Sequence, residues 1–424
     1  MNYREALKFV HSRQKFGSRP GLDNIRRITS LCSMPQRSMR FIHVAGTNGK
    51  GSVSTMLSNI LISAGYKTGL FISPYVIDFR ERIQIDGEMI PPTDFARIIS
   101  RIAPLVEQTD KEGFCVTEFE LVTCAALVYF EEQGCDYAVL EVGMGGRLDA
   151  TNVIDRPEVS VITRIDLDHT AILGDTVQKI AAEKGGIIKS GAPTVMYPDQ
   201  PDGVKAVISD ICAERGSRLI IPPTDFPTEN QGIGGSRIRL HGMDIKLNLI
   251  GAHQQLNAAT AAEAALAAGI QPIYIVRGIE KTVFAARMEL ISASPTVILD
   301  GAHNPNGAKA LSQTLKSVFG GQKAVAVMGM LADKDSDKAL EILTPCFSDI
   351  ITLTVPNPRT MTAAELKRKA SKYCPSVTAA RSYAQAIRLA DGISQGKPIV
   401  ICGSLYLAAA IRPKLIKYYK TQQD

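Results

Sequence analysis

The sequence predicts an α/β protein built around a mostly parallel β-sheet. Short runs rich in Val, Ile and Leu alternate with helical patterns along most of the 424 residues. Such runs are typical of parallel strands that are buried on both faces, because crossover helices cover both sides of the sheet. Several runs lead through a turn rich in Gly or Asp directly into a helical segment. Turns of this kind follow the carboxyl ends of strands, where α/β proteins collect ligands.

The first domain contains three of these strands. One is predicted over Arg40–Ala45 (RFIHVA), and the sequence GTNGKG leads from it into a helix over residues 52–64. Residues 136–142 (DYAVLEV) and 158–165 (EVSVITRI) predict two further buried strands. Residues 222–249 differ, since clusters of Pro, Gly and Asn precede short alternating strands. We expect this segment to form a small antiparallel insert that closes the first domain.

A second domain is predicted from a change in pattern. The sequence ISASP at 291–295 separates a helical pattern from a fresh strand at Thr296–Leu299, and DGAHNP then leads into a helix near 307–315. Three further apolar strands follow at Ala324–Met328, 349–355 and 398–402. We therefore assign residues 1–292 to a larger domain and residues 293–424 to a smaller, Rossmann-like α/β domain.

Charge and composition exclude some classes of protein. The net charge of +6, from 48 basic and 42 acidic residues, is small for this length, and no block of like charge occurs. We therefore expect no nucleic-acid partner, while the small excess suits anionic ligands. The N-terminal sequence is charged, and no run of about 18 apolar residues occurs, so neither a signal peptide nor a membrane span is expected. The eight cysteines lack C-x-x-C spacing, which indicates reduced thiols in a cytoplasmic protein.

Seven residues between the first strand and its helix form a candidate phosphate loop: Gly46, Thr47, Asn48, Gly49, Lys50, Gly51 and Ser52. The glycines let backbone N–H groups approach phosphate oxygens, and the helix directs its positive end at the same anion. Lys50 supplies a charge for the outer phosphates, and the Ser52 hydroxyl can reach a bridging magnesium ion. Two residues, instead of the usual four, separate the first Gly from the Gly-Lys pair. The alternative is a plain turn rich in Gly and Asn.

Three further polar residues lie at strand or helix ends. Glu141 ends the strand DYAVLEV, where a carboxylate beside a phosphate loop can hold Mg²⁺, although a capping or ion-pair role is the alternative. His169 follows the strand EVSVITRI, with Asp166 and Asp168 as competing ligands in the same turn. A lone histidine is more often structural. Lys184 lies at an expected helix end, where a cation followed by Gly is favourable without any further role.

Six motifs occur in one order and give the chain its resemblance to a known family. They are AGTNGKGS at 45–52, FISPY at 71–75, EVGMGGRLDATN at 141–152, LDHTAILGDT at 167–176, EKGGIIK at 183–189 and DGAHNP at 300–305. Over residues 20–412 the sequence resembles folylpolyglutamate synthase / dihydrofolate synthase, a branch of the Mur ligase superfamily. The resemblance implies an ATP-binding central domain of Mur ligase type over 1–292 and a glutamate ligase domain over 293–424.

The activity implied by the resemblance is ATP-dependent formation of an amide. The enzyme would join L-glutamate to dihydropteroate, to the glutamate tail of reduced folates, or to both. The substrate carboxylate would attack the γ-phosphoryl group of ATP, and the glutamate amine would then attack the acyl phosphate with release of ADP and phosphate. The implied cofactors are ATP and two Mg²⁺ ions. The implied partners are a pterin or folate, L-glutamate and ATP, bound by a cytoplasmic monomer.

A magnesium site beside the phosphate loop is also implied by the resemblance. The matching ligand positions are Ser52, Ser73, Glu141 and His169. Lys184 matches a lysine that is carbamylated in this family. A carbamate turns the cation into a carboxylate-like group, which would help to hold a second Mg²⁺. This reading makes Lys184 part of the catalytic set and replaces the structural role of a helix-end cation.

Nucleotide contacts from both domains follow from the same resemblance. Asn257, in the sequence HQQLNAA, resembles a residue near ATP. Arg287, Asp300 and His303 match second-domain contacts to the nucleotide and to the transferring phosphoryl group. Arg287 and His303 would join Lys50 in catalysis when the second domain closes, and closure would shield the acyl phosphate from water.

The pterin side of the substrate is assigned to two motifs and one loop. The motif residues are Thr117, Glu118, Phe119 and Glu120 of TEFE, and Leu148, Asp149 and Ala150 of LDA. The loop covers residues 21–24.

Three positions depart from the family pattern. Where the family usually has Trp-Pro-Gly-Arg, this chain has Phe284, Ala285 and Ala286 before Arg287, which changes the approach to the arginine. Gly185 replaces an Ala in the usual sequence Glu-Lys-Ala-Gly. Asp166 stands where Gly or Ala is usual, and it adds a charge near the expected metals.

Three other functions remain open at this point. A Mur-type ligase for another amino acid and acceptor would share the loop and the metal ligands, although TEFE and LDATN speak against it. A nucleotide-binding switch would explain the phosphate loop, but it would leave Arg287, Asp300 and His303 without a role. Simple phosphoryl transfer by a kinase is the third alternative.

Overall fold

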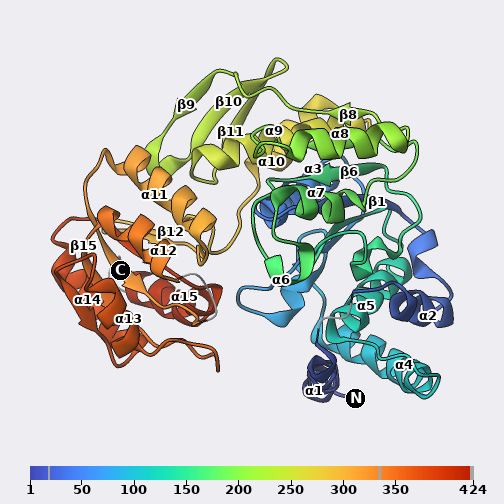
Figure 1. The fold of residues 1–424 in the computed structure, drawn as a ribbon, viewed down its shortest axis with the longest axis horizontal. Coiled ribbons are helices and arrows are strands. Elements are labelled where there is room, and N and C mark those ends of the chain that lie inside the picture. The colour runs from blue at the N-terminus through green and yellow to red at the C-terminus, as the bar shows by residue number, and fades with distance from the viewer. Residues whose placement is uncertain (18–19, 333–335, 421–424) are drawn as a thin grey trace. The chain divides into compact units, whose positions relative to one another are not determined.

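The computed structural model describes residues 1–17, 20–332 and 336–420 (Figure 1). The chain forms two compact units, each with its own β-sheet. The first unit comprises Met1–Pro227, Arg239–Ile245 and Leu256–Thr282. The second comprises Thr228–Ile238, Lys246–Gln255 and Val283–Asp424. These units are defined by contacts within the chain, and the domain boundary at residues 292 and 293 stays a prediction.

The first unit is built on an eight-stranded sheet in the order β4-β3-β2-β5-β1-β6-β7-β8. Its strands are β1 (Arg40–Ala45), β2 (Thr68–Phe71), β3 (Ile83–Ile85), β4 (Glu88–Met89), β5 (Tyr137–Glu141), β6 (Val159–Ile162), β7 (Thr194–Met196) and β8 (Leu219–Ile220). Six strands are parallel, while β3 and β4 form an antiparallel edge. The predicted mostly parallel sheet is therefore confirmed, and the run RFIHVA is its central strand.

Pairing of β1 with both neighbours brings three strand ends together. Val44 lies opposite Glu141 on β5 and opposite Val161 on β6. Because parallel strands end at the same edge of a sheet, the loops that follow β1, β5 and β6 share that edge. This register places the candidate phosphate loop beside Glu141 and beside the segment that follows β6.

Helices cover the sheet of the first unit (Figure 1). They are α1 (Tyr3–Ser12), α2 (Asp23–Leu31), α3 (Lys50–Ser63), α4 (Pro92–Lys111), α5 (Glu118–Glu132), α6 (Thr170–Leu173), α7 (Val177–Gly185), α8 (Val204–Glu214) and α10 (Pro272–Glu280), with short turns η1 (Arg13–Phe16), η2 (Pro35–Arg37), η3 (Phe79–Arg82) and η4 (Ala150–Val153). Helix α9 (Ala252–Ala267) contributes residues to both units. Helices α1, α2, α4 and α5 share one apolar core with the sheet, and α7 and α8 pack into another.

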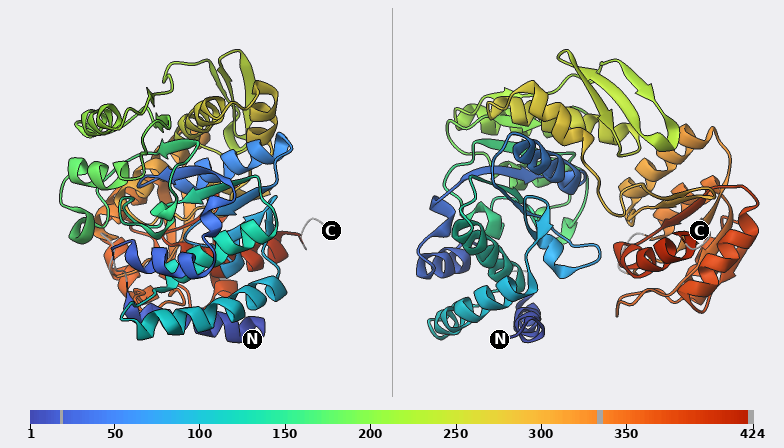
Figure 2. Two further views of the ribbon diagram at one scale, coloured as in Figure 1. Left: turned by 90° about the vertical axis from the view of Figure 1, so that its right-hand side faces the viewer. Right: turned by 180° about the vertical axis from the view of Figure 1, so that it is seen from behind.

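The expected antiparallel insert is present as a three-stranded sheet, coloured yellow-green in Figure 2. Its strands are β9 (Thr228–Asn230), β10 (Ser236–Leu240) and β11 (Met243–Leu247), with the turn η5 (Gly232–Gly234) before β10. Buried and exposed side chains alternate along β10 and β11, as expected for a sheet with one solvent face. His241 and Gly242 join these strands with φ of 49° and 78°, which fits a tight two-residue hairpin turn.

The second unit has a six-stranded sheet in the order β12-β13-β17-β14-β15-β16. Its strands are β12 (Glu289–Ala293), β13 (Thr296–Leu299), β14 (Ala324–Met328), β15 (Phe347–Thr352), β16 (Val377–Ala379) and β17 (Ile399–Cys402). Its helices are α11 (Pro305–Phe319), α12 (Ser336–Leu343), α13 (Ala363–Ala370), α14 (Tyr383–Ser394) and α15 (Leu405–Lys420), with the turn η6 (Thr344–Cys346). Only β12 runs antiparallel to its neighbour. This arrangement is the smaller α/β unit that the sequence predicts.

No helix in the part of the chain that the structure describes is long and apolar enough to cross a membrane.

Candidate active site

The phosphate loop connects β1 to α3 through two glycines that no larger residue could replace without movement. A Cβ on Gly46 would lie 1.8 Å from Oγ1 of Thr163, just after β6. Gly49 has φ of 88°, and a Cβ there would lie 2.6 Å from Oδ1 of Asn257. Asn257 is buried at this contact. The structure therefore brings Asn257 to the phosphate loop, although the two lie far apart in the sequence.

The loop is anchored to the segment after β6. The backbone N–H groups of Thr47 and Asn48 donate to the carbonyl of Arg164, at 2.8 and 3.1 Å. The Asn48 amide also donates to the Asp166 carboxylate at 3.5 Å, and the Arg164 guanidinium donates to the same oxygen at 3.4 Å. Burial raises the pKa of Asp166, while Arg164 acts in the opposite direction. Asp166, a competing metal ligand in the sequence, thus contacts the loop itself.

Two lysines converge on the carbonyl of Gly46. The Lys50 amine donates to this oxygen at 3.1 Å, and the Lys184 amine donates to it at 2.8 Å. Lys184 lies near the end of α7, as predicted, and its side chain is buried. Burial lowers the pKa of Lys184 to about 7, and the charge of Lys50 adds to this effect. A substantial fraction of Lys184 is therefore a neutral amine near neutral pH, and only a neutral amine is a nucleophile.

Glu141 and Ser73 lie together at the carboxyl end of β5. Glu141 is the last residue of that strand and is 4% exposed. Its Oε2 accepts a hydrogen bond from the Ser73 backbone N–H at 3.0 Å. Ser52 is buried in the first turn of α3. The carboxylate and the two hydroxyls belong to one unit: Glu141 ends β5, while Ser52 and Ser73 come after β1 and β2 of the same sheet.

His169 occupies a different local setting. It precedes the four-residue helix α6 with φ of 50°, in the left-handed region. Its side chain is 47% exposed, and Nε2 lies 3.9 Å from Oδ2 of Asp168. Among residues 1–17, 20–332 and 336–420, no group of three or more His, Cys, Asp or Glu side chains is arranged to hold a metal. Mg²⁺ is commonly held by one or two carboxylates together with substrate phosphates, so the donors Glu141, Ser52 and Ser73 fit that ion chemically.

The predicted substrate segments lie together near the start of α5. Thr117 caps this helix, and the Glu120 carboxylate accepts from both the backbone N–H and the hydroxyl of Thr117 at 2.8 Å. The Asn24 amide donates to Glu120 at 3.3 Å and to the Cys115 carbonyl at 3.1 Å. The N–H of Gly21 donates to the Leu148 carbonyl at 3.4 Å. These contacts join TEFE, LDA and the loop at 21–24.

The remaining substrate positions have structural partners of their own. Glu118 lies 3.0 Å from Nδ1 of His11. The ring of Phe119 packs against Phe71, and a Cβ on Gly143 would lie 2.5 Å from its edge. Asp149 is buried and accepts from Thr151 and Met144, and Ala150 begins η4. Burial raises the pKa of Asp149, although its hydrogen bonds oppose this shift.

In the second unit, the predicted residues gather around the start of β12 and the end of β13. The Asp300 carboxylate accepts the N–H of Met288 and the N–H of Ala302, both at 2.8 Å. Arg287 lies between Ala286 and Met288, which have φ of 55° and 48°. A Cβ on Gly301 would lie 2.9 Å from Nη1 of Arg287. Ala286 therefore adopts the left-handed conformation that favours glycine, and the turn before Arg287 forms without a glycine.

His303 and His253 complete this cluster. Nδ1 of His303 lies 2.8 Å from the Gly301 carbonyl, so this nitrogen carries the proton. His253 is partly buried. Desolvation lowers its pKa, while the charges of Asp300 and Arg287 act on the pKa in opposite directions. Sequence reasoning assigned no role to His253. The sequence contains one indication of a role, because His253 and Asn257 belong to the same motif, HQQLNAA. The sequence does not show which loop the ring of His253 would face.

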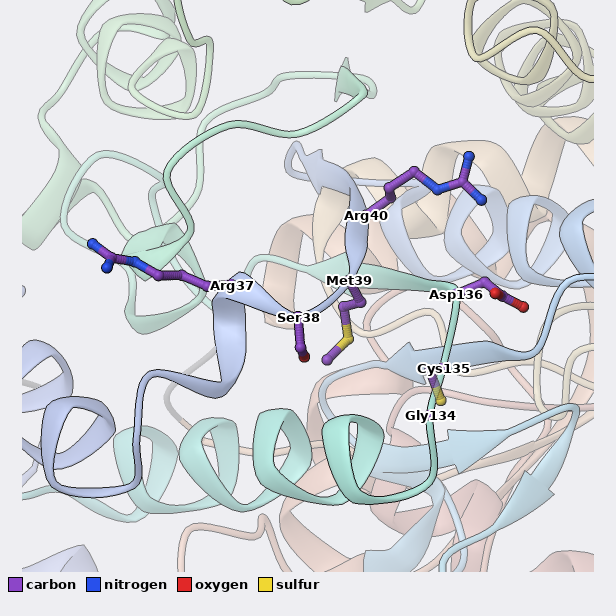
Figure 3. A pocket seen from close by; sticks show the side chains of 7 residues that line it. All are labelled: Arg37, Ser38, Met39, Arg40, Gly134, Cys135 and Asp136. Atoms are coloured by element: carbon purple, nitrogen blue, oxygen red, sulfur yellow. The ribbon is translucent and has the colours of Figure 1, made fainter.

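A surface pocket of about 530 Å³ lies at the amino-terminal ends of β1 and β5, the ends of these strands away from the phosphate loop (Figure 3). It is lined by Arg37, Ser38, Met39, Arg40, Gly134, Cys135 and Asp136. Figure 3 shows the side chains of Arg37 and Arg40 pointing in opposite directions. Arg37 lies 3.6 Å from Asp155, and Arg40 stacks 3.9 Å above the ring of Tyr137. The charged groups therefore do not converge on a ligand.

The fold and the loop contacts define a ligase of the Mur type. The Mur ligase middle domain family matches residues 44–265, and the Mur ligase glutamate ligase domain family matches residues 286–405. Folylpolyglutamate synthase of Lacticaseibacillus casei is 35% identical over 98% of this chain and 99% of that protein. The dihydrofolate synthase/folylpolyglutamate synthase of Bacillus subtilis (strain 168) is 34% identical over 97% and 99%. The structure of Mycobacterium tuberculosis folylpolyglutamate synthase complexed with ADP and AMPPCP superposes with a TM-score of 0.89, at 32% identity over 98% and 99% of the chains. This chain belongs to the folylpolyglutamate synthase / dihydrofolate synthase family.

Proposed function

We propose that this protein uses ATP to ligate L-glutamate both to dihydropteroate and to the glutamate tail of reduced folates. Ligation of glutamate to folates by an ATP-dependent enzyme is the activity of the family. The observation that carries the proposal is the convergence of Lys50 and Lys184 on the carbonyl of Gly46, next to the strand end that presents Glu141. A phosphate loop with two amines and an adjacent carboxylate suits transfer of a phosphoryl group.

Direct condensation of a carboxylate with an amine would have to expel oxide, which is a poor leaving group. ATP is needed because phosphorylation of the carboxylate replaces oxide with phosphate as the leaving group. In the proposed reaction, a carboxylate oxygen of the folate substrate attacks the γ-phosphorus, and the bond to ADP breaks. The glutamate amine then attacks the acyl phosphate, and the tetrahedral intermediate expels phosphate to leave the amide. Lys50 stabilises the charge that spreads over the phosphoryl oxygens, and the backbone N–H groups at the start of α3 bind the phosphates.

Magnesium, when bound, would offset the charge of the phosphates. Ser52, Ser73, Glu141 and His169 would hold magnesium, and a carbamate on Lys184 would help to hold a second ion. The chemistry of these donors supports the assignment, while the two-ion arrangement stays a prediction. The roles of Asn257, Arg287, Asp300 and His303 toward the nucleotide, and of TEFE and LDA toward the pterin, are proposals of the same kind.

Lys184 is proposed to carry a carbamate. Its neutral nitrogen would attack CO₂, form a nitrogen–carbon bond and lose one proton to give the carbamate anion. Two features support this step: the pKa of about 7 and the burial of the side chain, which excludes competing water. Mass spectrometry of the native protein in bicarbonate should detect an acid-labile addition of one CO₂, which Lys184→Met would abolish. Absence of the addition in the wild-type protein would contradict the proposal.

Product analysis tests the proposed activity directly. Dihydropteroate and tetrahydrofolate would be supplied separately, each with ATP, Mg²⁺ and L-glutamate, and the products separated by mass. Both substrates should gain glutamate with one ADP formed per amide. Product from one substrate alone would restrict the activity to that reaction. ADP formation with another amino acid would identify a different Mur-type ligase, and a stable phosphorylated product without glutamate would identify a kinase.

We also propose a cytoplasmic monomer. All eight cysteines carry free thiols, which supports a reducing compartment. Light scattering during gel filtration should give a mass near the chain's 45.8 kDa, and a mass of twice that value would contradict the monomer.

A further inference from the structure

His43 lies in the middle of β1 and has no role in the site described above. Its side chain is fully buried. Nε2 lies 2.9 Å from the hydroxyl oxygen of Thr151, which belongs to η4. Nδ1 is also buried, and it has no hydrogen-bond partner among the residues that the structure describes. One ring nitrogen of His43 therefore links the central strand β1 to η4, which lies more than a hundred residues later in the sequence.

The hydrogen-bond chain beyond Thr151 determines which nitrogen carries the proton. The Thr151 hydroxyl donates to Oδ1 of Asp149 at 2.6 Å. A hydroxyl has one proton, so its oxygen must accept from His43, and Nε2 must be the protonated nitrogen. Burial lowers the pKa of His43 to about 3, which keeps the ring neutral at physiological pH. The chain of donors therefore runs from His43 through Thr151 to Asp149.

Asp149 in turn fixes the loop that follows Glu141. Its Oδ2 accepts the N–H of Met144 at 2.9 Å, and its Oδ1 accepts the N–H of Thr151 at 3.0 Å. These bonds set the course of residues 143–149, here called the glycine loop after Gly143, Gly145 and Gly146. A carboxylate that accepts backbone N–H groups at both oxygens has little freedom to move.

The glycine loop touches the other parts of the site. A Cβ on Gly146 would lie 2.9 Å from the carbonyl of Lys184. The N–H of Arg147 donates to the Glu183 carbonyl at 2.8 Å, and the Leu148 carbonyl accepts from Gly21 at 3.4 Å. A change in the course of this loop would thus be felt at the catalytic helix end and at the proposed pterin segments.

We propose that His43 is a positioning residue that acts through Thr151 and Asp149 to hold the glycine loop in the conformation that binds the folate substrate. The proposal rests on the proposed function, because it assigns the loop to the folate side. The phosphate loop has separate anchors in Arg164 and Asp166. Loss of the His43 hydrogen bond should therefore weaken folate binding more than ATP binding.

Three substitutions of His43 separate the hydrogen bond from the size of the side chain. In His43→Gln the amide nitrogen lies as many bonds from Cβ as Nε2 does, so it can still donate to Thr151. In His43→Asn the nitrogen is one bond too short, and in His43→Phe no donor remains. We expect His43→Asn and His43→Phe to raise the KM for the folate substrate by about tenfold, which corresponds to one lost hydrogen bond. His43→Gln should stay within about threefold of the wild type, and the KM for ATP should change by less than about threefold throughout.

Substitution of Thr151 tests the chain at its next member. Thr151→Val removes the hydroxyl and should raise the folate KM as His43→Phe does, while Thr151→Ser keeps it and should not. The double variant His43→Phe/Thr151→Val should resemble either single variant, because both break the same chain. Effects that multiply in the double variant would overturn the proposal.

Nitrogen-15 NMR of labelled histidine gives a readout that does not depend on activity. The chain has six histidines, and the signal missing from His43→Gln identifies His43. It should show a neutral ring protonated at Nε2 and unchanged between about pH 5 and 9, unlike an exposed histidine with a pKa near 6.5. Protonation at Nδ1, or titration in this range, would overturn the inference. If the wild-type protein had no ligase activity, the proposed function would be wrong, but the NMR signal of His43 would still be as described. If the enzyme were active and the His43 variants had unchanged folate KM values, only the positioning role would be wrong.

Discussion

The amines of Lys50 and Lys184 donate to the same carbonyl oxygen, that of Gly46, at 3.1 and 2.8 Å. One lysine opens α3 and the other lies at the end of α7, so a single backbone atom joins two helices. Two amines this close disfavour a second positive charge, and burial already disfavours the charge on Lys184. Burial and the charge of Lys50 therefore both favour the neutral form of Lys184.

Lys184→Met should therefore change how stability depends on pH. The pKa of Lys184 is about 7 in the folded protein, and about 10.4 when the chain is unfolded. Between these values the unfolded chain binds the proton and the folded chain does not. Wild-type stability should rise with pH in this window, relative to Lys184→Met, by up to about 1.4 kcal/mol per pH unit.

Urea unfolding at several values between pH 7 and 9.5, in buffers free of bicarbonate, measures this difference. Lys184→Met should be the more stable protein at pH 7, and its advantage should shrink as the pH rises. Lys179→Met removes an exposed lysine of the same helix and serves as the control. Parallel curves for Lys184→Met and the wild type would show that the folded pKa is not lowered.

Gly49→Ala should impair nucleotide binding, and Gly65→Ala should not. Both glycines have φ of 88°, so an alanine meets the same backbone penalty of about 1 kcal/mol at either position. A Cβ on Gly49 would also displace Asn257, whereas no heavy atom lies within 4 Å of a Cβ on Gly65. We expect the Kd for ADP, measured by calorimetry, to rise at least about tenfold in Gly49→Ala alone. Equal affinities in the two variants would remove Asn257 from the nucleotide site.

Asp300→Ala should destabilise the turn that carries Arg287. It removes the acceptor of two backbone N–H groups, those of Met288 and Ala302, at a cost of about 2 kcal/mol. Asp300→Asn keeps one acceptor oxygen and should cost about half as much. The loss of stability is measured by thermal unfolding of the Asp300 variants, and their turnover is measured in parallel. Asp337→Ala, which removes a carboxylate from an exposed ion pair with Lys369, is the control and should change the stability little. A similar loss of stability in Asp300→Ala and Asp337→Ala would contradict the structural role of Asp300.

Glu141→Gln should raise the Mg²⁺ concentration needed for half-maximal activity. The amide oxygen can still accept the Ser73 N–H, so the fold should be kept while the charge is lost. We expect a shift of about tenfold, as one charged ligand is replaced by a neutral one. Glu158→Gln changes an exposed carboxylate just before β6 and should leave the Mg²⁺ titration unchanged. An unshifted titration for Glu141→Gln would exclude it as a ligand.

Much of the fold could be predicted because its strands are buried on both faces. The predicted bounds of Arg40–Ala45, Thr296–Leu299 and Ala324–Met328 are those of β1, β13 and β14. Strands such as β8 (Leu219–Ile220) are too short to give a recognisable pattern, and sequence analysis missed them.

The site was predictable only in part, for a different reason. Motif spacing located the phosphate loop, but the contacts of its neighbours depend on residues far away in the sequence. Asp166 is a competing metal ligand in the sequence, which does not show that its carboxylate also contacts Asn48 and Arg164. In the sequence, nothing distinguishes His43 from any other polar residue in an apolar strand. Its partner Thr151 lies 108 residues further along, so their contact cannot be read from the local pattern. Such pairs become visible only when the strands are placed side by side.

The central position of β1 has a consequence for how the enzyme would lose activity under mild stress. Amide protons of interior strands exchange with solvent only when the whole unit opens, whereas those of edge strands exchange through local fraying. The phosphate loop follows the interior strand β1 and Glu141 ends the interior strand β5, while β4 and β8 form the two edges. Fraying of the edge strands should therefore leave the phosphate loop and Glu141 in place, and their arrangement should be lost only when the first unit opens.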